Sequence, residues 1–282
     1  MTVIPNLVSV IIPNFNYAEY LRESIDSVLN QDYQAIEVIV VDDGSTDESL
    51  EILKSYGSQI KLIEITNSGA PTARNFGLMI AQGHYIAYLD ADDYWVKTKI
   101  SSQVRRLLEA KTDLVYCKMT VLDIDANTST VSKVSREGSF KNEFLLHPAR
   151  TPFPPSTALM TRELVARAGM WDTTFKSPAE DFDYFRRCAK FTDIAIVDEA
   201  LVIHRNHSKS LTSASLSRYY ADNCLGLIKL FADEYPSLSF LTRRKSWIKL
   251  NISFAKSFLK SSRPVSFGRC ILACILPINF KI

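Results

Sequence analysis

The sequence predicts an α/β protein in which a mostly parallel sheet is flanked by helices and followed by a C-terminal helical extension. Two observations support this. In residues 1–100, apolar runs of strand length alternate with segments of helical periodicity, an order typical of parallel sheets wound by right-handed crossovers. After Leu211 the pattern is helical only, which predicts an extension at 213–282.

Four strands are expected in residues 1–100, each an apolar run that ends in a polar turn. They are Val8–Ile12, Ile36–Val41, Ile60–Ile65 and Tyr85–Leu89. Helices are expected between them, the second opened by a capping box and the third by a proline in its first turn. These helices are Ala18–Leu29, one from Ser45-x-x-Glu48 to about Tyr56, and one from Pro71 towards Ala81.

The middle of the chain is less regular. We expect a helix, a strand, a hairpin or loop, and a proline-rich turn, at about 97–110, Leu114–Lys118, Asn127–Ser139 and Thr151–Pro155. The segment Ser177-Pro178-Ala179-Glu180 contains a capping box and a proline at the first helical position. It therefore predicts a helix over Glu180–Phe191.

Charge is distributed unevenly along the chain. The last acidic residue is Glu234, so 24 basic and 31 acidic residues precede Tyr235, a net charge of −7, whereas Tyr235–Ile282 carries nine Lys or Arg and a charge of +9. The apolar run Cys270–Ile278 is too short to span a bilayer. No secretory signal is expected, because Pro13 interrupts the first apolar run, and five cysteines without a CxxC pattern indicate thiols of a reducing cytosol.

Polar loops follow the predicted strands, and the carboxyl ends of parallel strands share one edge of a sheet. Asp42-Asp43 follows the second strand and Asp90-Ala91-Asp92-Asp93 the fourth, so five carboxylates gather at this edge. The loop after the first strand, PNFNYAEY, has no glycine and cannot form a glycine-rich phosphate cradle. A diphosphate would therefore need a divalent cation between itself and the carboxylates, and Mg²⁺ or Mn²⁺ prefers such oxygen ligands.

Five segments in order, VSVIIPNFN, VVDDGSTD, TNSGAPTARNFG, YIAYLDADD and AED, closely resemble family 2 glycosyltransferases of the GT-A fold. The resemblance covers about residues 7–212. It implies a Rossmann-like domain over 1–212, with a nucleotide-sugar-binding half at 1–100 and an acceptor-binding half at 101–212. It also implies an enzyme that moves a sugar from a nucleotide-diphosphate donor, UDP by family habit, onto an acceptor hydroxyl.

The resemblance assigns donor-binding roles to residues in four of the segments. Many relatives carry Tyr where this chain has Phe15, so only ring packing would remain there. The nucleobase and ribose would meet Pro13, Phe15 and Asn16, the uracil edge would meet Asp43 and Asp42, and the rest of the donor would meet Arg74, Asn75, Asp90 and Ala91.

The resemblance also implies a Mn²⁺ or Mg²⁺ site. Asp92 would contact the metal directly, Asp90 would bind the ribose or a metal-bound water, and His207 of the stretch HRNH would complete the metal or diphosphate site. The alternative for His207 is a surface histidine in a polar loop.

Glu180-Asp181 resembles the acid pair of the acceptor side, with Asp181 as general base. The alternative is structural, since Glu180 completes the capping box and Asp181 suits a first helical turn. The helix dipole would lower the pKa of Asp181 while nearby aromatic residues could raise it, and the sequence leaves this open.

The reaction implied is a single displacement with inversion, in which Asp181 accepts the proton of the acceptor. The chain lacks the Gln/Arg-x-x-Arg-Trp motif of processive synthases, so chain polymerisation is not expected. Two alternatives stay open, a sugar-phosphate nucleotidyltransferase and a non-catalytic sugar- or lipid-binding module of the same fold. The first would need a glycine-rich basic loop after the first strand.

The basic tail predicts contact with an anionic membrane through residues 235–282, and no nucleic-acid binding. One helical face would present Trp247, Leu250, Phe254 and Phe258 to lipid. The protein would then be cytoplasmic and peripheral at the inner face of the cytoplasmic membrane, with a glycan or lipid-linked acceptor of envelope polysaccharide or lipopolysaccharide synthesis. The alternative is that this face packs on the protein's own domain or on a second subunit.

Overall fold

The computed structural model describes most of the chain in two compact units. The described residues are 3–133, 136–140, 144, 153–175, 179–207, 216–233, 239–261 and 263–275. The first unit comprises Met1–Ser139, Pro152–Thr173 and Arg187–Ser208, and the second Phe140–Thr151, Thr174–Arg186 and Lys209–Ile282.

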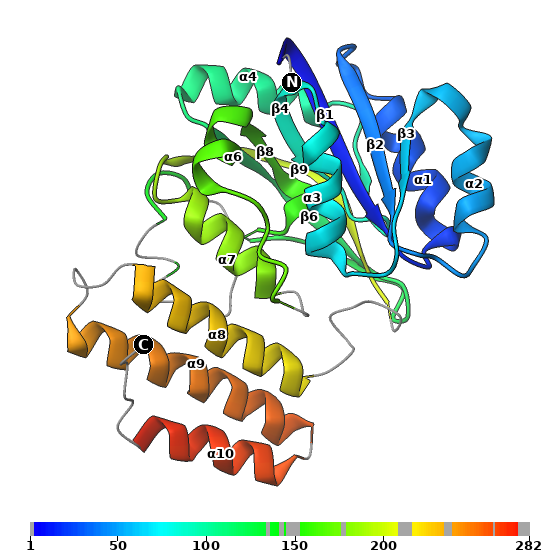
Figure 1. Ribbon diagram of the computed structural model, residues 1–282. Coiled ribbons are helices and arrows are strands. Elements are labelled where there is room, and N and C mark those ends of the chain that lie inside the picture. Colours follow the sequence, from blue (N-terminus) through cyan, green and yellow to red (C-terminus); the bar gives the residue numbers. More distant parts are fainter. Residues whose placement is uncertain are drawn as a thin grey trace. The chain divides into compact units, whose positions relative to one another are not determined.

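The four strands predicted in the N-terminal part are present and pair in parallel in the order β3-β2-β1-β4. They are β1 (Ile4–Asn14), β2 (Ile36–Asp42), β3 (Lys61–Glu64) and β4 (Gly83–Tyr88) (Figure 1). The last seven residues of β1 are buried because the strand lies inside the sheet, with α1 packed on one face, against Val10 and Ile12, and α3 on the other, against Ile11. Burial on both faces explains its nearly continuous apolar sequence.

The helices between these strands also agree with the periodicity. They are α1 (Ala18–Leu29), α2 (Ser49–Ser55) and α3 (Ala70–Ile80), which has Pro71 in its first turn. The predicted Ser45-x-x-Glu48 capping box is wrong. Ser45 hydrogen-bonds to Asp42 instead, and α2 begins at Ser49, whose N–H is bound by Asp47 Oδ1 at 3.0 Å.

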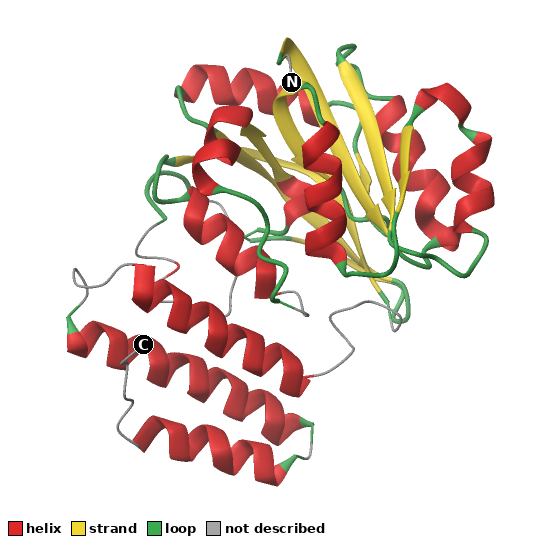
Figure 2. Ribbon diagram, in the orientation of Figure 1, coloured by secondary structure: helices red, strands yellow, loops and turns green. Residues whose placement is uncertain are grey.

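The second half of the first unit completes a sheet to which nine described strands belong, in the order β3-β2-β1-β4-β8-β6-β9-β5 with β7 on β6. Its elements are β5 (Tyr94–Trp95), α4 (Lys99–Ala110), β6 (Leu114–Asp123), β7 (Thr128–Val131), a 3₁₀ turn (Pro155–Thr157), β8 (Ala158–Thr161), α6 (Arg162–Ala168) and β9 (Ile194–Asn206) (Figure 2). Strand β8 runs antiparallel to both β4 and β6. The sheet is thus parallel in its first half, as expected, and mixed in its second.

The second unit contains α7 (Ala179–Cys188) up to Arg186, and the helices α8 (Leu216–Asp233), α9 (Phe240–Lys260) and α10 (Pro264–Ile275). The expected start of α7 at a Ser177 capping box lies outside the described residues. Helices α8, α9 and α10 enclose a core of their own. Its members are Leu227, Leu230, Phe231, Leu250, Phe254, Ala255, Phe258 and Cys270.

This core corrects the expectation for the tail. Leu250, Phe254 and Phe258 are buried between the helices, and the half-buried Trp247 donates from Nε1 to the carbonyl of Ala273 at 3.1 Å. The aromatic face therefore packs within the extension and does not meet lipid. In the part of the chain that the structure describes, no helix combines the length and apolarity needed to cross a membrane.

Candidate functional site

Asp42 organises the ends of β1 and β2. Its fully buried carboxylate accepts hydrogen bonds from Asn14 Nδ2 at 2.8 Å, Ser45 Oγ at 2.6 Å and Ser45 N at 2.9 Å. These bonds use both of its oxygens. Asp42, expected beside the nucleobase, therefore holds the two loops together.

Three residues at the end of β1 and in the loop after it were expected to meet the nucleobase, and only Phe15 presents an exposed apolar surface. Pro13 is buried inside the sheet opposite Val41. Asn16, with a φ of 59°, accepts from Thr46 N at 2.7 Å and so bridges the two loops. Phe15 is 37% exposed and offers its ring to a planar group.

Asp43 ties the β2 loop to the start of α3. Its Oδ1 and Oδ2 accept from the backbone N–H groups of Ser68 at 2.7 Å and Gly69 at 2.8 Å. The turn needs Gly44, whose φ is +75° and whose missing Cβ would lie 2.9 Å from Asn67 N. Asp43 is thereby fixed at the carboxyl edge of the sheet, where it was predicted.

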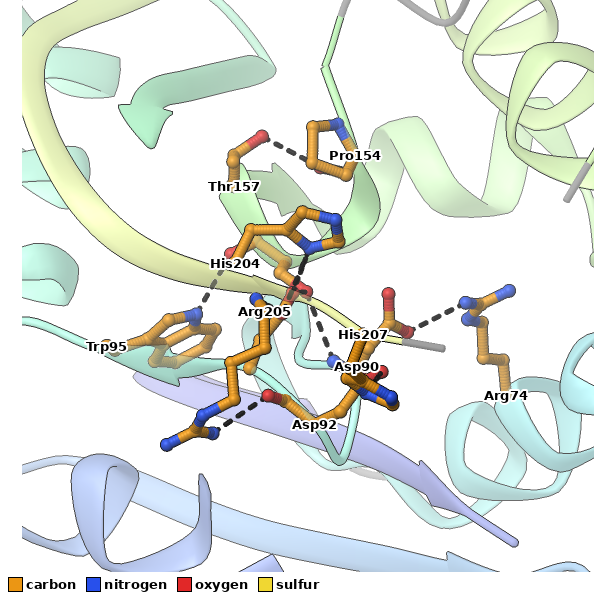
Figure 3. A network of polar contacts seen from close by, with 11 residues as sticks. Arg74, Asp90, Asp92, Trp95, Pro154, Thr157, His204, Arg205 and His207 are labelled. Carbon is orange, nitrogen blue, oxygen red and sulfur yellow. Dashed lines mark hydrogen bonds and ion pairs between the residues drawn. The ribbon is translucent and has the colours of Figure 1, made fainter. Parts of the chain in front are cut away.

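Arg74 of α3 reaches the loop after β4. Its Nη2 lies 2.9 Å from Asp90 Oδ1 (Figure 3). Its guanidinium carbon lies 4.5 Å from the centroid of the Trp171 ring. The neighbouring Asn75 binds the backbone of Trp171 with both amide atoms, at 2.9 and 2.8 Å. Asn75 thus positions the ring over which Arg74 lies.

Asp93 is the fully buried centre of the Asp90–Asp93 loop. It accepts from Ser156 Oγ at 2.7 Å and from the backbone N–H of Arg205 at 3.2 Å, and lies 3.0 Å from His204 Nδ1. Burial opposes the charge of the imidazole, but the carboxylate of Asp93 outweighs it and raises the pKa of His204 to about 9. The resulting ion pair joins the β4 loop to β9.

Asp92 and His207, both expected at the metal site, lie side by side. His207 Nε2 lies 3.3 Å from Asp92 Oδ2 (Figure 3). His207 is 6% exposed, and its ring centroid lies 4.9 Å from that of Tyr20, so it is not a surface histidine. Burial, followed by the charges of Asp93 and Asp90, raises the pKa of the Asp92 carboxyl above its usual range.

The carboxylates of the Asp90–Asp93 loop differ in their exposure, and so in how easily a ligand could reach them. The side chain of Asp90 is 28% exposed and that of Asp92 is 12% exposed, whereas Asp93 is enclosed. Ala91 between them is buried. No group of three or more His, Cys, Asp and Glu side chains is preformed for a metal ion among the described residues. The site offers the carboxylate–imidazole contact of Asp92 with His207, and Asp90 held by Arg74.

Glu180 and Asp181 lie in the first turn of α7, in the second unit. Glu180 is buried, whereas Asp181 is half-buried. Further along the helix, Asp183 and Arg186 form a buried ion pair of 2.7 Å, and Arg186 also contacts Asp233 of α8 at 2.9 Å. Asp181 is therefore the more accessible acid of the predicted pair.

Sequence reasoning missed several residues that shape the site. Ser156 accepts from the backbone N–H of Asp90 at 3.1 Å in addition to binding Asp93. Arg205 donates to the carbonyl of Asp92 at 2.8 Å and contacts Glu23. Arg205 lies within the HRNH stretch and could have been proposed from it, but Ser156 and Trp171 carry no sequence signal of their own.

Comparison with known proteins places the chain in a family. The model of the family described as Glycosyl transferase family 2 matches residues 9–169. An uncharacterized glycosyltransferase of Rickettsia prowazekii is 33% identical over 81% of this chain and 73% of its own length. The UDP-Glc:alpha-D-GlcNAc-diphosphoundecaprenol beta-1,3-glucosyltransferase WfaP of Escherichia coli is 42% identical over 39% of this chain and 45% of its own length.

Solved structures share the fold. S. aureus TarS 1-349 in complex with UDP-GlcNAc superposes with a TM-score of 0.71 and 21% identity, over 95% of this chain and 81% of that one; this chain spans half of the longer TarS chain. The mannosyltransferase PcManGT of Pyrobaculum calidifontis, in complex with GDP-Man and Mn²⁺, superposes with a TM-score of 0.59 and 21% identity, over 96% of this chain and 76% of that one. These structures confirm the GT-A fold. The family match excludes the nucleotidyltransferase alternative, and this chain belongs to glycosyltransferase family 2.

Proposed function

We propose that the chain is an inverting glycosyltransferase that moves a sugar from a UDP-sugar onto a hydroxyl of a lipid-linked glycan, with a divalent cation in its site. The contact of Asp92 with His207 beside the Arg74–Asp90 ion pair carries the proposal, because side chains suited to bind a cation and a diphosphate gather around one loop. The UDP-GlcNAc bound by TarS and the UDP-Glc in the name of WfaP support a UDP donor.

The donor would lie along the carboxyl edge of the sheet. The exposed ring of Phe15 suits stacking against a nucleobase, and Asp43, whose carboxylate is of the type that accepts an N–H of the base, is fixed at the same edge. Arg74 supplies positive charge beside the Asp90–Asp93 loop. The loops that form this surface would be held in place by Pro13, Asn16, Asp42 and Asn75.

The carboxylate and imidazole groups of this site suit a divalent cation. Asp92 and His207 would hold it, with Asp90 on the metal or on the ribose, and carboxylate with imidazole is a ligand set that Mn²⁺ accepts. Buried carboxylates that raise one another's pKa are stabilised by a cation. When bound, the cation would neutralise negative charge on the diphosphate leaving group.

Asp181 would act as general base. Asp181 is half-buried in the first turn of α7. In the single displacement proposed, the acceptor oxygen forms a bond to the anomeric carbon while the bond to the diphosphate breaks, and Asp181 takes the hydroxyl proton. Glu180, buried in the same turn, would support the helix.

The acceptor and the location follow from the relatives and the charge of the tail. WfaP acts on a diphosphoundecaprenol-linked sugar according to its name. A lipid-linked acceptor in cell-envelope polysaccharide assembly would place the enzyme at the inner face of the cytoplasmic membrane, where the basic tail could meet anionic lipid.

A thermal-shift panel of nucleotide-diphosphate sugars, with and without Mn²⁺, tests the donor. We expect UDP-sugars with Mn²⁺ to raise the melting temperature most, and UDP release to follow when a diphosphoundecaprenol-linked sugar is added. Stabilisation by GDP- or dTDP-sugars alone would overturn the choice of UDP. Donor binding without transfer to any lipid-linked sugar would favour the non-catalytic module.

A further inference from the structure

Helix α9 has two opposite faces of different character. One face carries the buried core residues of the second unit, among them Leu250, Phe254 and Phe258. On the other face, exposed basic and aliphatic residues recur at the three- and four-residue spacing of a helix. This face, termed the basic stripe, comprises Leu241, Lys245, Lys249, Ile252, Lys256, Leu259, Lys260 and Arg263, which lies just past the helix end.

The basic stripe is exposed although it contains large aliphatic side chains. Leu241 is 68% exposed, Leu259 63% and Ile252 42%. They alternate along the helix with lysines that are also exposed. Because the core of the unit occupies the opposite side of α9, the packing of α8 and α10 does not need these residues.

No acidic residue near the stripe in sequence balances its positive charge. No Asp or Glu occurs from Tyr235 to Ile282, so α9 and α10 contain none. Not every basic residue of the tail is available. Arg244 lies off the stripe and donates to the carbonyl of Cys274 at the end of α10, at 2.7 Å, where it stabilises the helix terminus. Lys245, Lys256 and Lys260 of the stripe are exposed and have no such role among the described hydrogen bonds and ion pairs.

We propose that the basic stripe of α9 binds the headgroup layer of an anionic bilayer. Its lysines would meet lipid phosphates while Leu241, Ile252 and Leu259 enter the boundary between headgroups and acyl chains. Long lysine stems allow the ammonium groups to stay in the headgroup layer while their methylenes lie deeper. The inference rests on the proposed function in one respect, that a lipid-linked acceptor gives such binding a purpose.

The aliphatic residues favour a lipid surface over other anionic partners. A purely electrostatic partner needs lysines alone, whereas exposed leucine and isoleucine among them gain free energy by leaving water. The charge of the rest of the chain, −7 before Tyr235, would be repelled by the same anionic surface. Attraction of the tail and repulsion of the remainder would together favour binding through the stripe.

Co-sedimentation with vesicles tests the proposal on the full chain. Vesicles of phosphatidylethanolamine and phosphatidylglycerol are compared with vesicles of phosphatidylcholine at low and high salt. We expect the protein to pellet with the anionic vesicles only, and less at high salt. Lys245→Gln/Lys256→Gln/Lys260→Gln should weaken binding about 100-fold, since each basic residue contributes roughly fivefold.

Two control variants make the result specific. Lys54→Gln/Lys97→Gln/Lys133→Gln removes three exposed charges from the first unit and should bind vesicles like the wild type. Leu259→Gln keeps the charge of the stripe and should reduce binding to anionic vesicles by roughly tenfold, because a leucine that enters the boundary layer contributes about that much.

Several outcomes would overturn the proposal. One is absence of wild-type binding to anionic vesicles, and another is equal loss of binding in the stripe and control triple variants. A stripe variant that changes the sedimentation coefficient without vesicles would show that the stripe binds a second copy instead. UDP-sugar binding is measured on the same variants in the absence of lipid. If it fails in the wild type, the proposed function fails while the stripe can still pass its own test.

Discussion

Ser156 donates from its Oγ to Asp93 Oδ2 at 2.7 Å, and both side chains are fully buried. The same Oγ accepts the backbone N–H of Asp90 at 3.1 Å, and the carbonyl of Ser156 accepts from Trp95 Nε1 at 2.9 Å. A short 3₁₀ turn therefore sets the conformation of the loop that carries Asp90 and Asp92. The acidic loop is positioned from a distant part of the chain.

Replacing Ser156 by alanine should loosen this loop. The substitution leaves the N–H of Asp90 without its partner, so we expect a loss of about 1–3 kcal/mol in the free energy of unfolding. The affinity for UDP with Mn²⁺ should fall about 10–100-fold, as is usual when a group that orients metal ligands is lost. Urea denaturation and calorimetric titration measure the two effects.

Ser24→Ala is the matched control for Ser156. Ser24 is a buried serine of α1 whose Oγ has no hydrogen-bond partner among the described residues. Its removal should change neither stability nor donor affinity by much. Equal effects of the two substitutions would show that Ser156 has no positioning role.

Asp92→Ala should abolish the Mn²⁺-dependent part of UDP binding, and EDTA should reproduce the loss in the wild type, because the variant lacks the carboxylate that faces His207. Calorimetric titration of UDP with and without Mn²⁺ measures this. Asp32→Ala, which removes an exposed carboxylate bound to Ser101, is the control and should bind UDP normally. Undiminished UDP affinity in EDTA would contradict the metal site.

Asp181→Asn should leave UDP binding intact and reduce kcat about 10²–10⁴-fold, the usual contribution of a general base. Glu180→Gln should mainly cost stability, about 0.5–1 kcal/mol, because an acidic residue in a first helical turn interacts with the helix dipole. Steady-state kinetics and thermal melts separate the two effects. If both variants lose activity equally, Asp181 is not the base.

Lys99 should make stability depend on pH. It is fully buried, with Nζ 3.7 Å from the centroid of the Trp95 ring and 2.7 Å from Gln103 Oε1. Burial lowers the pKa of Lys99 from 10.5 to about 8. Between these values the unfolded chain binds a proton that the folded chain has released, so the Lys99 contribution to stability rises with pH across this window.

Lys99→Met should therefore stabilise the protein most near neutral pH, by at most about 3 kcal/mol, and the advantage should shrink as the pH rises towards 10.5. Urea denaturation of both proteins across this range measures the difference. Both proteins carry Cys117→Ala, because burial raises the pKa of that thiol to about 11 and the thiol interacts electrostatically with Lys99. A difference that does not vary with pH would mean that Lys99 titrates normally.

Much of the first unit could be predicted from sequence because its rules are local. Apolar runs and helical periodicity located β1 to β4 and the helices between them, and parallel topology then placed the acidic loops at one edge. The role of Asp93 as the buried centre of its loop could not be predicted. The partners of Asp93 are Ser156 and His204, which lie 63 and 111 residues away in sequence.

The tail shows the limit of an amphipathic pattern. Periodicity identified Leu250, Phe254 and Phe258 as one apolar face of a helix, and this was correct. It could not say what would cover that face, because α8 and α10 supply the covering residues. Lipid was the wrong partner for the aromatic face, and the opposite side of α9 carries the exposed basic residues.

The place of β8 in the sheet has a consequence for synthesis on the ribosome. Thr161, Met160 and Leu159 pair with Tyr85, Ile86 and Ala87 of β4, so the edge of β4 is open until the chain has grown by about seventy residues more. A nascent chain that stalls before β8 exposes an apolar strand ready to pair with another copy. Residues 1–100 therefore contain most of the residues proposed to bind the donor, but they should not fold alone, and a fragment ending there should aggregate.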